Sequence, residues 1–132
     1  MRLRRGTTFH LTADMVREVH LEALDRFGGL HGVRDTTLLE AAVAAPQATR
    51  AGIPAVVDLP GIAAAYLFYL VRNRPFVDAN KRTALGACLV FLRLNGVDPL
   101  VNDDGWRTLT LAVADGTMGR EEAAARVRTL IH

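Results

Sequence analysis

One short segment, residues 72–84 (RNRPFVDANKRTA), combines residue types that suit phosphate chemistry. A proline turn leads into the first turn of a strongly apolar predicted helix, and a helix N-terminus presents unpaired backbone N–H groups and the positive end of the helix dipole. Lys81 and Arg82 fall in this first turn, where the dipole disfavours cations, so we expect a bound anion to offset their charge. Lys81 is also the one lysine beside fifteen arginines, which indicates that a compact point charge is needed there.

Asp78 immediately precedes this helix, and two roles are open for it. As an N-cap, its carboxylate would accept a hydrogen bond from a backbone N–H of the first turn. As a metal ligand, it would bind a magnesium ion that bridges bound phosphates. Both roles can hold only if the two carboxylate oxygens divide them.

Other chemistries lack the necessary residues. The chain has no serine, which excludes a serine hydrolase. His10, His20, His31 and His132 stand ten or more positions apart, without the short spacings of zinc sites, so we expect no metal held by histidine. Cys88 is the one cysteine and lies in an apolar run, where a buried, inert thiol is expected.

Charge and hydropathy argue against nucleic acid and membrane as partners. The net charge is only +2, too small for a surface built to neutralise a phosphate backbone, and Arg2, Arg4 and Arg5 are interpreted as a solvated terminal arm. No apolar stretch reaches the roughly 20 residues that span a bilayer. The N-terminal residues lack the apolar core of a signal peptide, so we expect a cytoplasmic protein.

The fold class follows from length and periodicity. The chain has 132 residues, 50% of them hydrophobic, which suits one domain over residues 1–132, and the apolar residues recur at helical spacing. We predict a compact all-α bundle of about six helices, with the very apolar fourth helix buried at its centre. Residues 47–60 are expected to form a surface loop or small hairpin. The expected helices run from about 13 to 27, 36 to 46, 61 to 72, 79 to 95, 104 to 116 and 118 to 131.

Four of these helices have an expected N-cap. The first is capped by Thr12, and the second by Thr37 in a capping box with Glu40. The fifth is capped by Asp103 or Asp104, and the sixth by Thr117.

The string PFVDANKRTAL resembles the signature of the Fic/Doc superfamily. Ala79 and Lys81 are similar to the death-on-curing (Doc) branch, whereas Fic adenylyltransferases typically carry glycine at both places. The resemblance spans about residues 11–96 and includes FGGLHGVRDTTLLEAAVAAPQ and FLRLNG. It implies a Fic/Doc-type helical bundle and a toxin of a type II toxin–antitoxin system. Such a toxin transfers the terminal phosphate of ATP, with Mg²⁺, to a threonine of elongation factor Tu and so blocks translation.

The resemblance also implies roles for the residues of the motif. The backbone around Ala79, Asn80 and Lys81 would hold the ATP phosphates, and Lys81 and Arg82 would neutralise their charge. Asp78 would position the metal and the substrate, and Phe76 would be a buried wedge that fixes the loop.

Two partner surfaces are implied in the same way. Members of the superfamily align the backbone of the target protein on a flap. The residues at the matching location in this chain are Gly52, Ile53, Pro54, Ala55 and Val56. The second partner would be an antitoxin whose disordered C-terminal segment folds as a helix into a groove on the toxin.

One position departs from the family pattern HxFxDANKR, because Arg74 stands where the pattern has histidine. That histidine removes the proton from the attacking hydroxyl, and a guanidinium, with a pKa above about 12, has donors only. We therefore expect a chain that is inactive as written. His20 and His31 are interpreted as packing or turn residues rather than a relocated base.

Several explanations of Arg74 stay open. It could be an introduced inactivating change, a natural decay, or the mark of a pseudoenzyme that binds a nucleotide or an antitoxin without chemistry. An ancestral adenylyltransferase of the Fic type is a further alternative.

Overall fold

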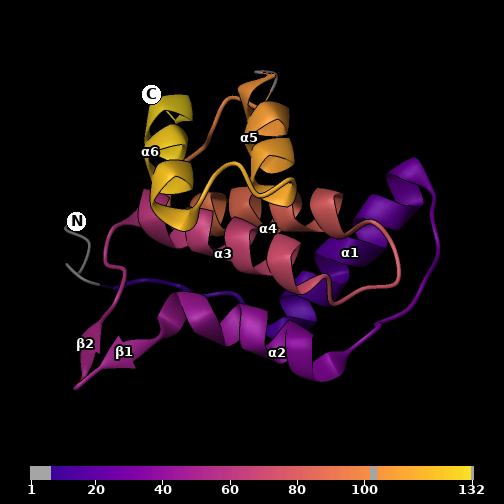
Figure 1. Cartoon of the computed structure of the whole chain (residues 1–132), viewed down its shortest axis with the longest axis horizontal. Helices are drawn as coiled ribbons and strands as arrows, with labels where there is room; N and C mark the ends of the chain where they lie inside the picture. The colour runs from indigo at the N-terminus through magenta and orange to yellow at the C-terminus, as the bar shows by residue number, and fades with distance from the viewer. Residues whose placement is uncertain (1–6, 102–103, 132) are drawn as a thin grey trace.

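The computed structural model describes residues 7–101 and 104–131, in which six α-helices and one short β-hairpin follow each other along the chain (Figure 1). The predicted all-α class is confirmed. The helices are α1 (Ala13–Phe27), α2 (Thr36–Ala44), α3 (Leu59–Asn73), α4 (Asn80–Leu94), α5 (Gly105–Ala114) and α6 (Arg120–Leu130), with a 3₁₀ turn at Ala45–Gln47 and strands β1 (Thr49–Arg50) and β2 (Ile53–Pro54) between α2 and α3.

The central helix is α3, not α4 as predicted. In Figure 1, α5 and α6 lie above α3 and α4, and α2 lies below, and α3 packs against α2, α4, α5 and α6. Nine of its 15 residues are buried, against six of 15 in α4. Helix α4 is apolar in the middle, but its cations Lys81, Arg82 and Arg93 are exposed and keep one side in water.

The N-caps of the first two helices come from short polar side chains. The hydroxyl of Thr12 accepts a hydrogen bond from the Met15 N–H (3.1 Å), which confirms the predicted cap. Helix α2 is capped by Asp35, whose Oδ1 accepts from the Leu38 N–H (3.0 Å). The predicted cap at Thr37 is wrong, because Thr37 already lies inside the helix whereas Asp35 has the extended backbone that a cap requires.

The last two helices begin without a side-chain cap. Asp104 stands at the N-cap of α5 but makes no capping hydrogen bond, and Asp103 lies outside the described residues, as do Arg2, Arg4 and Arg5. The cap predicted at Thr117 for α6 is wrong. The Thr117 hydroxyl donates to Asp115 (2.6 Å), and Gly119 occupies the N-cap position.

The segment between α2 and α3 is a hairpin with a two-residue turn. Ala51 (φ 52°) and Gly52 (φ 79°) both have positive φ, as a type I′ turn requires, and Arg50 pairs with Ile53 across it. The hairpin alternative of the prediction is therefore confirmed. Asp58 follows, where it caps α3 through the Gly61 N–H (3.1 Å) and pairs with Arg128 of α6 (2.6 Å).

Helices α1 and α4 approach each other closely at Gly86. A Cβ atom at Gly86 would lie 2.7 Å from Cγ1 of Val19, so only glycine fits at this separation. On the other side of α4, Cys88 is fully buried, and desolvation raises the pKa of its thiol to about 12. The interpretation of Cys88 as an inert thiol is confirmed. Within residues 7–101 and 104–131, no helix is long and apolar enough to cross a membrane.

Candidate functional site

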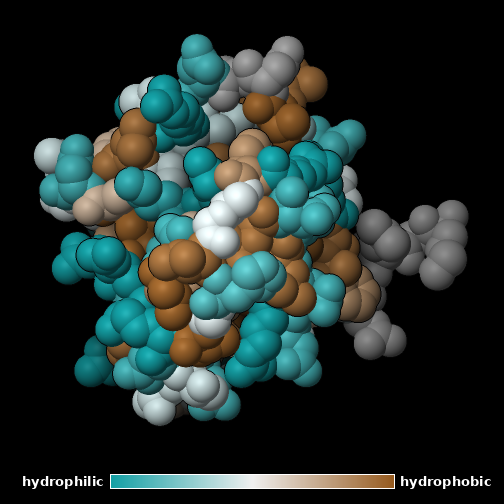
Figure 2. Space-filling view, turned by 90° about the vertical axis from the view of Figure 1, so that its right-hand side faces the viewer, coloured by the Kyte–Doolittle hydropathy of each residue, from teal (hydrophilic) through white to brown (hydrophobic). Residues whose placement is uncertain are grey.

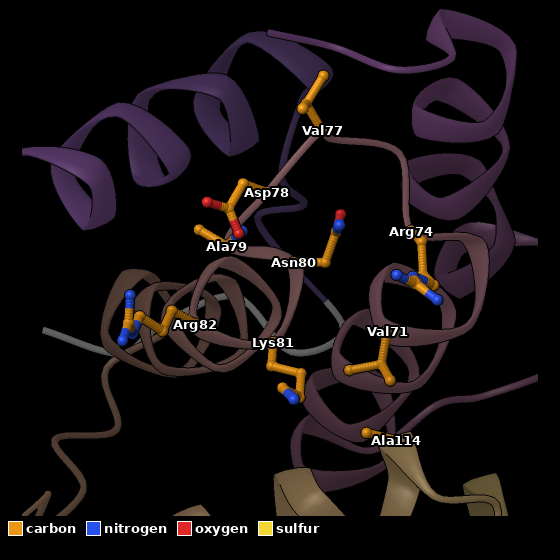
Figure 3. Close-up of a pocket in the computed structure, with 9 residues that line it drawn as sticks. All are labelled: Val71, Arg74, Val77, Asp78, Ala79, Asn80, Lys81, Arg82 and Ala114. Carbon is orange, nitrogen blue, oxygen red and sulfur yellow. The ribbon is translucent and has the colours of Figure 1, made fainter. Parts of the chain in front are cut away.

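The loop between α3 and α4 forms the wall of a pocket of about 450 Å³ (Figure 3). Six of the motif residues to which the sequence analysis gave a role line this pocket, and the seventh, Phe76, lies beneath the loop as a buried residue. The lining residues are Val71, Arg74, Val77, Asp78, Ala79, Asn80, Lys81, Arg82 and, from the end of α5, Ala114.

The loop has an unusual backbone at both ends. Arg74, which ends α3, and Ala79, which stands at the N-cap of α4, both have left-handed conformations, with φ of 47° and 62°. This region costs an L-residue other than glycine roughly 1–2 kcal/mol, so contacts around the loop must hold it.

Two contacts fix the middle of the loop. The Asn80 side chain accepts a hydrogen bond from the Phe76 N–H (2.9 Å) and donates one to the Phe76 carbonyl (2.9 Å). The Phe76 side chain is 2% exposed, as a wedge should be. The Asn80 side chain therefore holds the loop at Phe76.

His20, from α1, is the second support of the loop. Its ring stacks on the Phe76 ring, with centroids 3.9 Å apart and planes inclined by 8°, and its Nε2–H donates to the Asp78 carbonyl (3.0 Å). His20 packs as expected, but the sequence analysis missed that it holds the motif. A histidine on the buried face of α1 is the one signal that points to this role.

The carboxylate of Asp78 is exposed and oriented by two backbone N–H groups. Its Oδ1 accepts from the Ala79 N–H (2.8 Å) and its Oδ2 from the Leu30 N–H (3.0 Å). These hydrogen bonds, helped by the charges of Arg82 and His20, lower the pKa of Asp78, so the group is ionised near neutral pH. Asp78 is not the N-cap of α4, because Ala79 occupies that position.

Glycine is required beside this carboxylate. A Cβ atom at Gly29, where φ is +130°, would lie 2.8 Å from Oδ2 of Asp78. The absence of a side chain at Gly29 lets the backbone after α1 approach closely enough for the Leu30 N–H to reach Asp78.

The first turn of α4 offers donors to an anion. Its first intrahelical hydrogen bond runs from the Thr83 N–H to the Ala79 carbonyl (3.0 Å), which leaves the N–H groups of Asn80, Lys81 and Arg82 without a partner among the described residues. Three backbone donors therefore open beside the pocket.

The two cations of this turn differ in direction. Figure 3 shows the Lys81 side chain running toward Ala114, whereas the Arg82 side chain leaves the helix in another direction. The Arg82 guanidinium lies 4.8 Å from the centroid of the Phe27 ring, a cation–π contact. Both residues line the pocket, but the guanidinium of Arg82 is engaged by Phe27, which leaves Lys81 as the cation of this turn without such a contact among the described residues.

Position 74 contributes a second charge in place of a base. The Arg74 side chain is exposed and lines the pocket, and it forms no ion pair with any described residue. No histidine is among the lining residues, and Asp78 is their one carboxylate. Across the described ranges, no three His, Cys, Asp or Glu side chains gather as a metal cluster.

The predicted flap residues lie elsewhere. Gly52, Ile53, Pro54, Ala55 and Val56 do not line this pocket, since the hairpin leads into the start of α3 and the pocket is at its end (Figure 1). Ala55 and Val56 instead line a separate hollow against α6. A docking role for this hairpin stays a prediction.

Acidification is expected to destabilise the fold through His20. Burial lowers its pKa, although the hydrogen bond to Asp78 opposes the shift, so the folded chain binds fewer protons than the unfolded chain, whose histidines titrate near about 6.5. The free energy of unfolding should therefore fall as the pH drops from 7.5 to 5. His10, which is also lowered by burial, adds to this effect.

Urea unfolding at several pH values tests the role of His20. The dependence on pH should be shallower in His20→Gln than in the parent chain. Equal slopes in the parent and His20→Gln would contradict the assignment.

Comparison with known proteins gives two kinds of match. Residues 10–92 match the model of the Fic/DOC family. The chain is 35% identical over 121 residues to the protein kinase doc of Escherichia phage P1, an alignment that covers 92% of this chain and 94% of that protein. It is 55% identical over 71 residues to the toxin Doc of Mycolicibacterium smegmatis, covering 54% and 55% of the two chains. The family match contains every pocket residue except Ala114.

Proposed function

Because this chain belongs to the Fic/Doc family, in its Doc branch, we propose that it is a Doc-like toxin whose pocket binds ATP and magnesium. The observation that carries the proposal is the start of α4, where Asn80, Lys81 and Arg82, whose backbone N–H groups have no partner among the described residues, line the same pocket as Asp78. An anionic ligand fits this set of donors, and a cation fits the ionised carboxylate.

Each of these residues has a role in holding the nucleotide. The N–H groups of Asn80, Lys81 and Arg82 donate to phosphate oxygens, and the Lys81 ammonium neutralises their charge. Asp78 would hold the magnesium, an ion that proteins commonly bind through one or two carboxylates plus the phosphates of the substrate. When bound, the metal neutralises charge on the transferred phosphate.

The reaction that we propose for the family site is transfer of the terminal phosphate to a protein hydroxyl, a threonine of elongation factor Tu. Transfer requires that the hydroxyl lose its proton, and the Arg74 guanidinium cannot accept it. We therefore propose that the chain binds nucleotide but is inactive with Arg74 in place. The likeness of Ala79 and Lys81 to the Doc branch, and the similarity of the chain to a protein kinase doc, support phosphorylation over adenylylation.

A phosphorylation assay with purified elongation factor Tu tests the function. ATP labelled in the terminal phosphate should label the factor with Arg74→His and not with the parent chain. Label transferred only from ATP labelled in the first phosphate would favour an adenylyltransferase. Nucleotide binding without labelling by a folded Arg74→His variant would favour the pseudoenzyme.

An antitoxin is the proposed partner, and the groove between α1 and α4 is the surface that suits its helix. Phe27, Leu85, Leu89 and Val90 are among the groove's lining residues. The face that holds the end of α1 and the loop before α4 gathers hydrophobic side chains along its middle (Figure 2). The lining of the groove includes three arginines, Arg26, Arg82 and Arg93, against one acidic residue, Glu22, which favours a helix with acidic residues beside its apolar face.

Truncating Phe27 is expected to weaken antitoxin binding. The ring is 62% exposed, so Phe27→Ala should leave the fold intact while removing an aromatic anchor, and we expect the dissociation constant to rise by about ten-fold or more. Leu111→Ala, an exposed leucine of α5 outside the groove, is the matched control. Calorimetry with the cognate antitoxin measures both, and equal affinities would remove the groove as the docking surface.

A further inference from the structure

We propose that Arg34 is a positioning residue for the side chain at position 74, because it fastens the backbone that carries this side chain to the start of α2. The inference rests on the proposed function, in which position 74 is the place of the proton acceptor. Arg34 lies outside the motif and does not line the pocket.

The contact is a clamp on successive carbonyl groups. The Arg34 guanidinium donates through Nη2 to the Asn73 carbonyl (2.8 Å) and through Nε to the Arg74 carbonyl (2.8 Å). The backbone N–H groups of Arg34 and Asp35 both donate to the Pro75 carbonyl (2.7 and 3.1 Å). The carbonyls of residues 73, 74 and 75, at the end of α3, are thus all held by two adjacent residues. Carbonyls at a helix C-terminus otherwise lack intrahelical partners.

The clamp acts where the backbone is least favourable. Arg74 has φ 47° and ψ 58°, a conformation that a residue with a Cβ atom adopts reluctantly. Its N–H is held by the Leu70 carbonyl (3.2 Å), and its own carbonyl is held by Arg34. With the carbonyl released, the backbone could relax to an ordinary conformation, and the side chain would turn away from the pocket that Figure 3 shows it lining.

The clamp is itself held in place. Asp35 caps α2, and the Asn73 side chain donates back to the Leu38 carbonyl (3.0 Å), so the start of α2 and the end of α3 are joined in both directions. The Arg34 guanidinium forms no ion pair with a carboxylate in the described part of the chain, so no such pair competes with its hydrogen bonds to the two carbonyls. Its planar fork reaches two carbonyls at once, which a lysine ammonium at the end of a flexible stem cannot match.

Kinetics test the inference in the Arg74→His background. Adding Arg34→Met is expected to reduce kcat by at least about ten-fold, since general-base catalysis depends on position. The affinity for ATP with magnesium should stay within about two-fold, because Lys81 and the N–H groups of α4 are untouched. Arg34→Lys should recover part of kcat, and Arg126→Met, which removes an exposed arginine of α6, should leave it unchanged. Equal kcat with and without Arg34 would overturn the inference.

A spectroscopic readout keeps this test separate from the proposed function. The NMR one-bond Cα–Hα coupling and the Cα shift of residue 74 distinguish positive from negative φ, and they can be measured in the parent chain without any substrate. We expect Arg34→Met to lose the signature of positive φ and Arg126→Met to keep it. If Arg34→Met keeps the signature of positive φ, the inference is overturned, whatever the activity of Arg74→His. An inactive Arg74→His variant would count against the proposed function alone.

Discussion

Arg74→His is expected to raise the rate of phosphate transfer to elongation factor Tu by about 10²- to 10⁴-fold, the usual contribution of a positioned general base. The structure makes this a minimal change. The side chain at position 74 already lines the pocket, and the left-handed backbone there is one that histidine adopts more readily than most residues. A neutral imidazole supplies the lone pair that the guanidinium lacks.

Two further substitutions separate base catalysis from the removal of charge. Arg74→Gln and Arg74→Ala take away the cation without supplying a base, so both should stay near the rate of the parent chain. The rate of Arg74→His should rise with pH as the introduced imidazole loses its proton, whose usual pKa is about 6.5. Equal gains in Arg74→Gln and Arg74→His would show that Arg74 blocks the pocket rather than replaces a base.

Lys81→Ala is expected to weaken the binding of ATP with magnesium by about 10- to 100-fold, since a hydrogen bond to a charged group contributes about 1.5–3 kcal/mol. Arg82→Ala should have a smaller effect, because the Arg82 guanidinium is already engaged in the cation–π contact with the Phe27 ring. Arg93→Ala removes an exposed cation from the last turn of the same helix and is the matched control.

Calorimetric titration of the parent chain measures these affinities without any need for catalysis. The expected order of affinity is parent and Arg93→Ala first, then Arg82→Ala, then Lys81→Ala. A parent chain that binds no nucleotide, or a Lys81→Ala variant as strong as the parent, would remove the phosphate-binding assignment of α4.

Local patterns were enough to predict the motif and most helix limits. The run of residues 74–82 crosses a single turn, so its members must lie close together wherever the turn is placed. Thr12 and the turn after Phe27 are local signals of the same kind. The limits of α3 and α4 lie within two residues of those predicted, because proline and glycine mark them.

What could not be predicted depends on contacts distant in sequence. His20 and Leu30 reach Asp78 across 58 and 48 positions, and no periodicity reports such pairs. The left-handed backbone of Ala79 could not be predicted either, because alanine rarely adopts this conformation. As a result Ala79, and not Asp78, is the N-cap residue of α4. The choice of α4 as the central helix failed because counting apolar residues ignores which side of a helix its cations occupy.

The close approach at Gly86 makes the site sensitive to a change far from any charge. His20 follows Val19 directly, so a methyl group at Gly86 that pushed Val19 outward would carry the imidazole with it and loosen its stack on Phe76. The distance between α1 and α4, which depends on the absence of a side chain at Gly86, thereby affects how well His20 holds the loop between α3 and α4. A single carbon added at Gly86 would therefore loosen the loop that carries the motif while leaving every polar residue of the chain unchanged.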